Sequence, residues 1–408
     1  MAPEPRNRAI RFRKVFDPFA AHLCRYVEGR SARTIVERGR NLVAAAPQVV
    51  VPNNATAQFI ALLGRSLRYL RTEGEFAVPT ETVRAGAHLT WLGTRAEHPG
   101  SSVVLAATEL LRRHWATGIS DLESEELFAQ LAWIDPSGAR GVDAARAVEQ
   151  QRMTGEVLSA GPTPDPAWDR DVLEPLINQF NEARQGADDA RVIARLGVGI
   201  VEAVEAALRP AWDATWRAVD LVDSLPVAAS VGDRWRDDRY DFGRHAQRVD
   251  TGEARFRTRD SVKQSAWMIT QRERADAALA ASEALDDPMV MAGVIADGQA
   301  ITGTVIDVNP PMVTVALAEP CPVPEGVELH WTELPSKCSV EVRRVTGDDQ
   351  RTVELETKKG KTKYYPSVGQ RVVYSPFNLA WFKPPTLPAD VPWTHLGRAG
   401  DAQPEVPE

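Results

Sequence analysis

The sequence predicts an α+β protein of several domains, in which a mainly α-helical N-terminal part precedes a small antiparallel β-barrel. Up to about residue 298, apolar residues recur at helical spacing between short breaks. Beyond that point they alternate with polar residues, as in half-buried strands. The 408 residues allow several domains, at roughly 100–200 residues each. The 43% apolar and 25% charged content excludes collagen, a fully disordered chain and a small disulfide scaffold.

Residues 1–158 are predicted to form an N-terminal helical domain, built as a bundle. Ser31 and Asn54 are candidate N-caps, and Ser120-Asp-Leu-Glu123 has the pattern of a capping box ahead of an apolar run. Helices are expected over residues 31–46, 55–71, 103–116 and 121–133.

A second helical domain is predicted over residues 167–298, after a linker rich in Pro, Gly and Ser. Pro210 is expected to start or kink a helix in which Trp212 and Trp216 share one side, because they lie four residues apart. Two long polar helices, over about 231–250 and 258–285, are predicted to form a helical hairpin.

Residues 299–376 are predicted to form the barrel, of SH3-like or OB-like type, because six short alternating segments are separated by turn signals. The strands are expected in AITGTVIDV, MVTVALA, GVELHW, CSVEVRRV, RTVELET and QRVVYS. Residues 377–408 are predicted to be an extended, proline-rich tail.

Cysteine usage and hydropathy predict a cytoplasmic protein without a membrane anchor. Cys24, Cys321 and Cys338 are the three cysteines, and none belongs to a C-x-x-C pair, which is typical of a reducing compartment. The N-terminus lacks the apolar core of a signal peptide. Apolar stretches fall far short of the roughly 20 residues that span a bilayer.

Several enzyme classes lack their motifs in this sequence. It contains no P-loop, no complete G-x-G-x-x-G, no G-x-S-x-G and no H-E-x-x-H. No two of the seven histidines lie three or four residues apart, so no local metal pair is predicted, although a site assembled from distant histidines stays open. We therefore expect no cofactor. The net charge of −8 argues against a protein that coats DNA through a globally basic surface.

The segment DDRYD at 237–241 allows two interpretations. On a helix, Asp237, Asp238 and Asp241 share a face with His245 and could hold Mg²⁺ against a diphosphate. Arginines are interleaved with these acids, however, and ordinary i, i+4 ion pairs explain the same pattern.

The same segment is rich in cations close to aromatic rings. Arg234, Arg236 and Arg239 alternate with Trp235 and Tyr240, a pattern that suits a phosphate backbone with base stacking. Acidic residues in the same interval favour the alternative of helix packing and ion pairs.

The predicted barrel holds a more compact basic segment, TKKGKTKYY, at the tip of an expected hairpin. Small barrels often bind oligonucleotides through basic loops and exposed aromatic rings. A solubilising loop that protects a sheet edge is the alternative. The candidate nucleic-acid-binding residues here are Lys358, Lys359, Lys361, Lys363, Tyr364 and Tyr365.

These patterns predict a non-catalytic accessory or adaptor protein that binds the phosphate backbone of DNA or RNA through the barrel hairpin and scaffolds a partner enzyme such as a helicase or nuclease. One alternative is a pure protein–protein interaction subunit of a larger assembly. A second is a Mg²⁺-dependent enzyme that uses the DDxxD helix. No membrane partner is expected.

Overall fold

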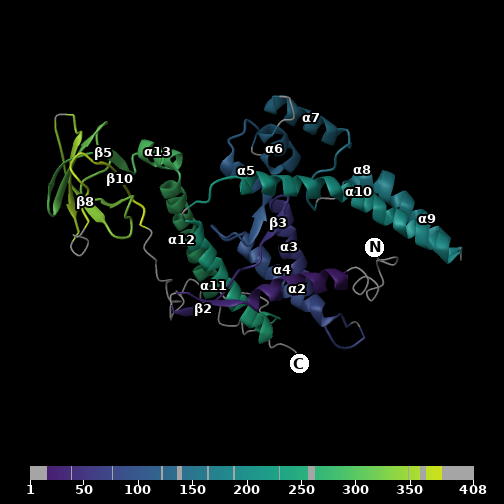
Figure 1. The fold of residues 1–408 in the computed structure, drawn as a ribbon. Helices are drawn as coiled ribbons and strands as arrows, with labels where there is room; N and C mark the ends of the chain where they lie inside the picture. The colour runs from purple at the N-terminus through teal and green to yellow at the C-terminus, as the bar shows by residue number, and fades with distance from the viewer. Residues whose placement is uncertain are drawn as a thin grey trace, which may run out of the picture. The chain divides into compact units, whose positions relative to one another are not determined.

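The chain divides into two compact units, which are Met1–Val227 with Val231–Thr258 and Ala228–Ser230 with Arg259–Glu408. The architecture, shown in Figure 1, comes from a computed structural model of the protein. The structure describes residues 16–37, 39–75, 77–120, 123–135, 140–162, 165–186, 189–228, 230–255, 262–347, 349–358 and 364–378. The predicted α+β architecture is confirmed, since a mainly helical part precedes a closed antiparallel barrel. The predicted domain boundaries near 158 and 298 lie within these units and remain predictions.

The first described helix, α2 (Asp17–Ser31), has an apolar stripe that the sequence analysis did not identify. Its buried residues follow the spacing of one helical face and are Ala20, Leu23, Cys24 and Val27. Pro18 lies in the first turn, where its missing N–H costs no hydrogen bond. The helix ends at Ser31, so this residue is not the N-cap that the sequence suggested.

The helix predicted over 31–46 is wrong. This region forms an antiparallel hairpin of β1 (Thr34–Glu37) and β2 (Arg40–Val43). The β-branched run Thr34-Ile-Val36 favours extended backbone. Gly39 has a φ of +75°, a conformation that favours glycine, and it lies in the turn between the two strands. Local strand preference and turn chemistry therefore outweigh the weak helical spacing.

Two helices fill the crossover between a short parallel pair of strands, β3 (Val49–Val51) and β4 (Val104–Ala106). Helix α3 (Asn54–Leu67) and helix α4 (Thr80–Ala96) are in close contact. Asn53 caps α3 by accepting a hydrogen bond from the Thr56 backbone N–H at 3.1 Å, one residue before the predicted cap.

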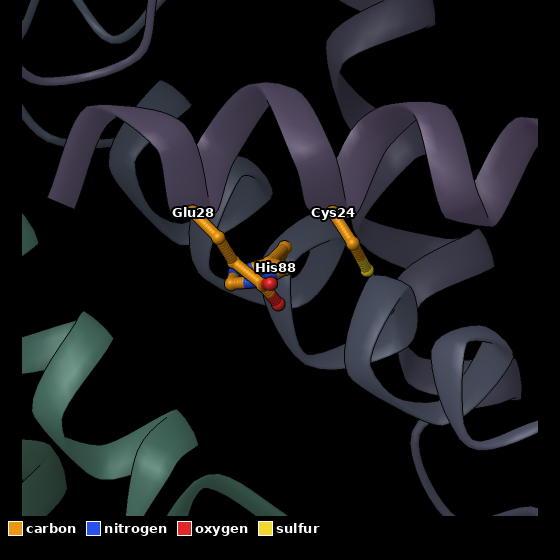
Figure 2. Close-up of side chains that lie close together, drawn as sticks. All are labelled: Cys24, Glu28 and His88. Carbon is orange, nitrogen blue, oxygen red and sulfur yellow. The ribbon is translucent and has the colours of Figure 1, made fainter. Parts of the chain in front are cut away.

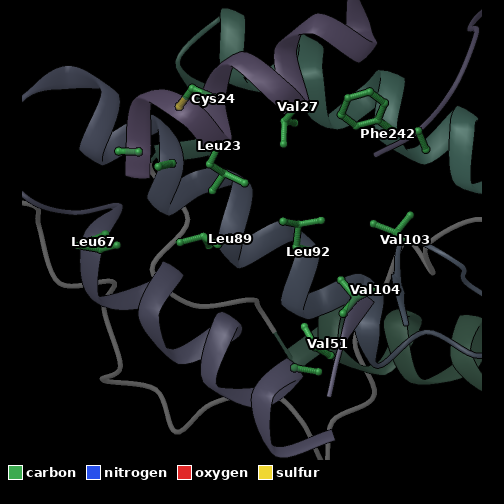
Figure 3. Packing of buried hydrophobic residues seen from close by; sticks show 14 of the residues in the cluster. Leu23, Cys24, Val27, Val51, Leu67, Leu89, Leu92, Val103, Val104 and Phe242 are labelled. Atoms are coloured by element: carbon green, nitrogen blue, oxygen red, sulfur yellow. The ribbon is translucent and has the colours of Figure 1, made fainter. Parts of the chain in front are cut away.

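A glycine sets how closely α3 and α4 approach. A Cβ on Gly93 of α4 would overlap Cα and Cβ of Ala61 of α3. Figure 3 shows a core of the first unit, where buried side chains from α2, α3, α4, β3 and β4 meet Phe242. Phe242 thus packs on a cluster whose other buried residues lie between positions 20 and 106.

The remainder of the first unit is helical. Helix α5 (Ala107–His114) and helix α6 (Leu127–Ile134) pack on α10. The predicted capping box is present, because the Ser120 N–H donates to Glu123 Oε2 at 2.9 Å and the Glu123 N–H donates to Ser120 Oγ at 3.3 Å. The capping box precedes the short 3₁₀ turn Glu123–Glu125, and α6 begins only at Leu127, whereas the sequence predicted a helix from residue 121. The other helices are α7 (Gly141–Met153), α8 (Pro166–Trp168) with a following π-helical segment, α9 (Glu174–Gln185) and α10 (Ala190–Asp223).

The two long polar helices predicted near residue 250 are present and belong to different units. Helix α11 (Val231–Asp250) packs against β2, α2 and α4 in the first unit. Helix α12 (Val262–Asp286) belongs to the second unit, where it contacts α13 (Pro288–Ala296). Among the described helices, none has the length and apolarity needed for a membrane span.

All six predicted barrel strands are present. They form a closed barrel in the order β10-β5-β6-β9-β8-β7, with each pair antiparallel. An OB-fold has five strands and is partly open, so the SH3-like or OB-like assignment remains a prediction. Buried and half-buried residues alternate along β6 and β9, and the buried side chains fill the barrel interior. The strands are β5 (Ile301–Asn309), β6 (Met312–Leu317), β7 (Glu328–Trp331), β8 (Ser339–Thr346), β9 (Thr352–Thr357) and β10 (Arg371–Ser375).

Candidate functional site

The described part of the basic barrel hairpin carries one ion pair. Lys358 Nζ lies 2.6 Å from Glu328 Oε2, and this contact lowers the pKa of Glu328. The charge of Lys358 is therefore compensated locally. The other three lysines of the prediction, Lys359, Lys361 and Lys363, lie outside the described residues.

The two tyrosines that follow the hairpin differ in their surroundings. Tyr364 is 40% exposed, and Lys337 Nζ lies 5.7 Å from the centroid of its ring. Tyr365 is half-buried and packs against the barrel core. Lys337 was not predicted, because it lies about twenty residues before the lysine cluster and only the folded sheet brings it close. The start of β8 brings together Lys337, Lys358 and Tyr364. The Lys358 N–H donates to the Ser339 carbonyl oxygen, and the Cys338 thiol donates to the Tyr364 carbonyl oxygen.

Two of the three arginines predicted to contact phosphate from the segment around DDRYD, Arg236 and Arg239, instead contact a carboxylate of the first unit. Arg236 Nε lies 2.6 Å from Glu37 Oε1, and Arg239 contacts the other oxygen of Glu37. The two hydrogen bonds lower the pKa of Glu37. Arg234 is half-buried. The clamp on Glu37 joins α11 to the β1–β2 hairpin, so two of the three predicted phosphate contacts already have a carboxylate partner.

The carboxylates of DDRYD have three different environments. Asp238 is fully buried and accepts hydrogen bonds from Arg95, Ser101 and both donors of Ser102, at 2.6 to 3.0 Å. Asp241 accepts from Trp91 Nε1 at 3.0 Å, whereas Asp237 is exposed. A magnesium site needs carboxylates that converge on one point with free oxygens. Asp238 instead pairs with Arg95 of α4, and Asp241 pairs with Arg244 three residues further along the chain, so the described ion pairs of these acids are not the i, i+4 pairs that the sequence predicted.

Two histidines that are 157 residues apart in sequence lie in contact in the core of the first unit. His88 Nδ1 of α4 is 3.0 Å from His245 Nε2 of α11, and both side chains are buried. Trp91 stacks on His245 with ring centroids 4.8 Å apart. Burial lowers the pKa of both histidines. One nitrogen of the pair must donate and the other accept, so the two rings together carry at most one positive charge.

Cys24 and Glu28 of α2 lie beside His88 (Figure 2). Cys24 and Glu28 lie four residues apart, so they share one face of the helix. Glu28 Oε1 is 3.4 Å from His88 Nε2, and one ligand atom from each of the three residues lies within 4.8 Å of the others. Burial raises the pKa of the Cys24 thiol to about 12, and the thiol donates to the Glu81 carbonyl oxygen at 3.6 Å.

A narrow cavity borders Glu28 and His88. It has a volume of about 10 Å³ and is also lined by Phe242 and Asp250. This is about the space that one water molecule requires. Arg84 Nη2 lies 2.8 Å from Glu28 Oε1 and 3.8 Å from Asp250 Oδ1, so a cation bridges the acids at the rim. The sequence left open a site built from distant histidines, but no spacing in it identifies His88 and His245 as the two that meet.

The long helix α10 presents an exposed apolar face, which we call the α10 stripe. Its members lie three, four or seven residues apart, as one face of a helix requires, and are Val198, Val201, Leu208, Trp212 and Trp216. Trp212 and Trp216 are 60% and 52% exposed, and their rings form an edge-to-face pair at 6.1 Å. Ala214 and Ala218 on another side of α10 pack with α5 and α6.

Comparison with known proteins identified no matching protein family, no similar curated protein and no similar solved structure.

Proposed function

We propose that this chain is a non-catalytic adaptor that holds a protein partner through the α10 stripe. Exposed apolar side chains that share one helix face are candidate interaction sites. Leu208, Trp212 and Trp216 follow one another at i, i+4 spacing, and the exposed Glu205–Arg209 ion pair lies between them and Val198 with Val201. The stripe includes two tryptophans, and tryptophan is among the residues that contribute most to the affinity of protein interfaces. The exposure of Trp212 and Trp216 to 60% and 52% on one face of α10 is the observation that carries this proposal.

The charges along α10 suggest the chemistry of the partner. Residues 190–200 carry Arg191 and Arg195 and no acid, which amounts to +2. Residues 213–223 carry three aspartates and one arginine, which amounts to −2. A partner helix with an apolar face, acidic at one end and basic at the other, would match both the stripe and this polarity. The geometry therefore favours an amphipathic helix of another protein as the occupant.

The first step of the test is to identify proteins that co-purify with the full chain. Each of these proteins is then purified, and its affinity for the chain is measured by calorimetric titration. The double variant Trp212→Ala/Trp216→Ala should bind at least about 30-fold more weakly, because truncating a hot-spot residue costs about 2 kcal/mol or more. The matched control is Met153→Ala/Val227→Ala, which removes two exposed apolar side chains outside the stripe. Equal affinity of the stripe variant and the wild-type chain for every partner, or the lack of a partner that binds the purified chain, would contradict the proposal.

A second candidate function is contact with the phosphate backbone of DNA or RNA at the barrel end. The cluster of Lys337 and Tyr364 beside Lys358 supports it, because a cation next to an exposed ring suits a phosphate next to a stacked base. The ion pair of Lys358 with Glu328 weakens it, since a phosphate would have to compete with that carboxylate.

Filter binding at several salt concentrations tests this second function. Neutralising Lys358, Lys359, Lys361 and Lys363 should flatten the dependence of log K on log salt by up to ~3–4 units if all four meet phosphates. The matched control replaces four exposed arginines of the helical unit, which are Arg112, Arg113, Arg140 and Arg170. No retention of either nucleic acid at low salt, or an equal effect of the control, would contradict direct binding.

A further inference from the structure

We propose that Cys24, Glu28 and His88 bind a divalent cation of the zinc type, and that His245 is a positioning residue for His88. This inference is independent of the adaptor function, because it concerns the core of the first unit and not the surface of α10. The three residues come from two helices, α2 and α4, that pack directly against each other.

The donor set indicates the class of ion. Thiolate, imidazole and carboxylate are the ligands that zinc takes in proteins, whereas magnesium and calcium prefer oxygen alone. The distance of 3.4 Å between Glu28 Oε1 and His88 Nε2 is long for a hydrogen bond. It equals the edge of about 3.3–3.4 Å between two ligands bound at about 2.0–2.1 Å in a tetrahedral site. One ligand atom of each residue lies within 4.8 Å of those of the other two. Zinc bond lengths put the sulfur about 3.6 Å from the other two ligand atoms in a tetrahedral site, so the Cys24 side chain must move by up to about 1 Å to complete the third corner.

The surroundings have the features of a metal site's outer shell. Zinc requires the unprotonated Nε2 of His88, which leaves the proton on Nδ1, and Nδ1 is the atom that contacts His245 Nε2 at 3.0 Å. The stacking of His245 on Trp91 fixes the plane of that acceptor ring. Arg84 hydrogen-bonds the Glu28 carboxylate, as outer-shell groups commonly do for a ligating carboxylate.

The cavity beside Glu28 and His88 supplies a fourth position. Its volume of about 10 Å³ suits one water molecule, and three protein ligands plus one water is a common arrangement around zinc. The Cys24 thiolate and the Glu28 carboxylate together carry −2 against the +2 of the ion, and at the rim the positive charge of Arg84 faces the negative charge of Asp250. The proton released from the thiol passes to solvent buffer when the ion binds.

Titration of the full chain with Co²⁺ and Zn²⁺ tests the proposal. We expect one ion per chain, tetrahedral d–d absorption with Co²⁺, and a sulfur-to-cobalt charge-transfer band. Cys24→Ser should abolish that band, and the control Cys321→Ser, in the second unit, should keep it. His245→Gln should weaken binding by about 10–100-fold while the spectrum of the bound ion is retained, as expected for a positioning residue.

A measurement on the wild-type chain keeps the proposal falsifiable if a core variant does not fold. X-ray absorption of the zinc-loaded protein should show one sulfur at about 2.3 Å and nitrogen or oxygen neighbours at about 2.0–2.1 Å. A first shell without sulfur, a charge-transfer band that survives in Cys24→Ser, or the lack of binding of both ions would overturn it.

Discussion

Arg95 of α4 and Asp238 of α11 form a buried ion pair, with 2.6 Å between Arg95 Nη2 and Asp238 Oδ1. The Asp238 side chain is fully buried, and that of Arg95 is 9% exposed. Ser101 and Ser102 donate the remaining hydrogen bonds, so the carboxylate is fully satisfied in the core. This arrangement holds α11 against α4 and positions His245 next to His88.

Asp238→Asn should destabilise the first unit by about 3–5 kcal/mol, because the buried Arg95 charge then keeps only its longer contact with Asp241, at 3.9 Å between Nε and Oδ2. Its neighbour Asp237 is exposed, and desolvation raises the pKa of its carboxyl. Asp237→Asn should therefore leave the unit as stable at pH 7 or stabilise it by less than about 0.5 kcal/mol. Urea denaturation followed by circular dichroism measures both. Similar effects of the two variants would show that the ion pair does not stabilise the fold.

The clamp of Arg236 and Arg239 on Glu37 predicts a loss of stability in acid. The pKa of Glu37 is lowered in the folded state, so its contribution is present above the unfolded pKa of about 4.3 and is lost as the pH falls through the folded pKa. Glu37→Gln should be less stable than the wild-type chain at pH 7, and this difference should shrink as acid is added. Thermal melts over this pH range measure the effect, and a difference that does not change with pH would contradict the clamp.

Gly93→Ala should cost about 1–3 kcal/mol, because the added methyl group would overlap Ala61 across the contact of α3 and α4. Gly199→Ala on α10 is the matched control. Among the described residues, nothing beyond its chain neighbours and the backbone of α10 lies within 4 Å of the added Cβ there, and the variant should be stabilised by about 0.4–1 kcal/mol. The sign of the two changes in unfolding free energy is the readout, and a stabilised Gly93→Ala would disprove the close approach.

Tyr374 in the barrel offers a test of buried polarity. Its ring is 1% exposed, burial raises the pKa of its hydroxyl, and that hydroxyl has no hydrogen-bond partner among the described residues. Tyr374→Phe should therefore leave the barrel as stable as before or stabilise it by about 1 kcal/mol, since an unsatisfied buried hydroxyl is unfavourable. A loss of stability of 1 kcal/mol or more would indicate that an ordered water satisfies the hydroxyl.

Local patterns in the sequence determined most of the secondary structure. The alternation along residues 301–375 predicted each barrel strand, because a strand that faces a core on one side has a period of two. Helical spacing predicted α3, and α11 was predicted as one of two long polar helices. Pro210 was expected to start or kink a helix, but it lies inside the single helix α10. Helical spacing failed over 31–46, where β-branched residues and Gly39 form a hairpin, and it identified neither α2 nor α4.

Only the tertiary structure decided which polar side chains meet. His88 and His245 are 157 residues apart, and Arg95 and Asp238 are 143 residues apart, so no spacing rule connects them. Folding also decided which cations pair with carboxylates, since Glu37 contacts Arg236 and Arg239 and Glu328 contacts Lys358, three residues that the sequence predicted to bind phosphate. The physical reason is that periodicity reports which face of an element is buried, whereas contacts between polar groups depend on how whole elements pack.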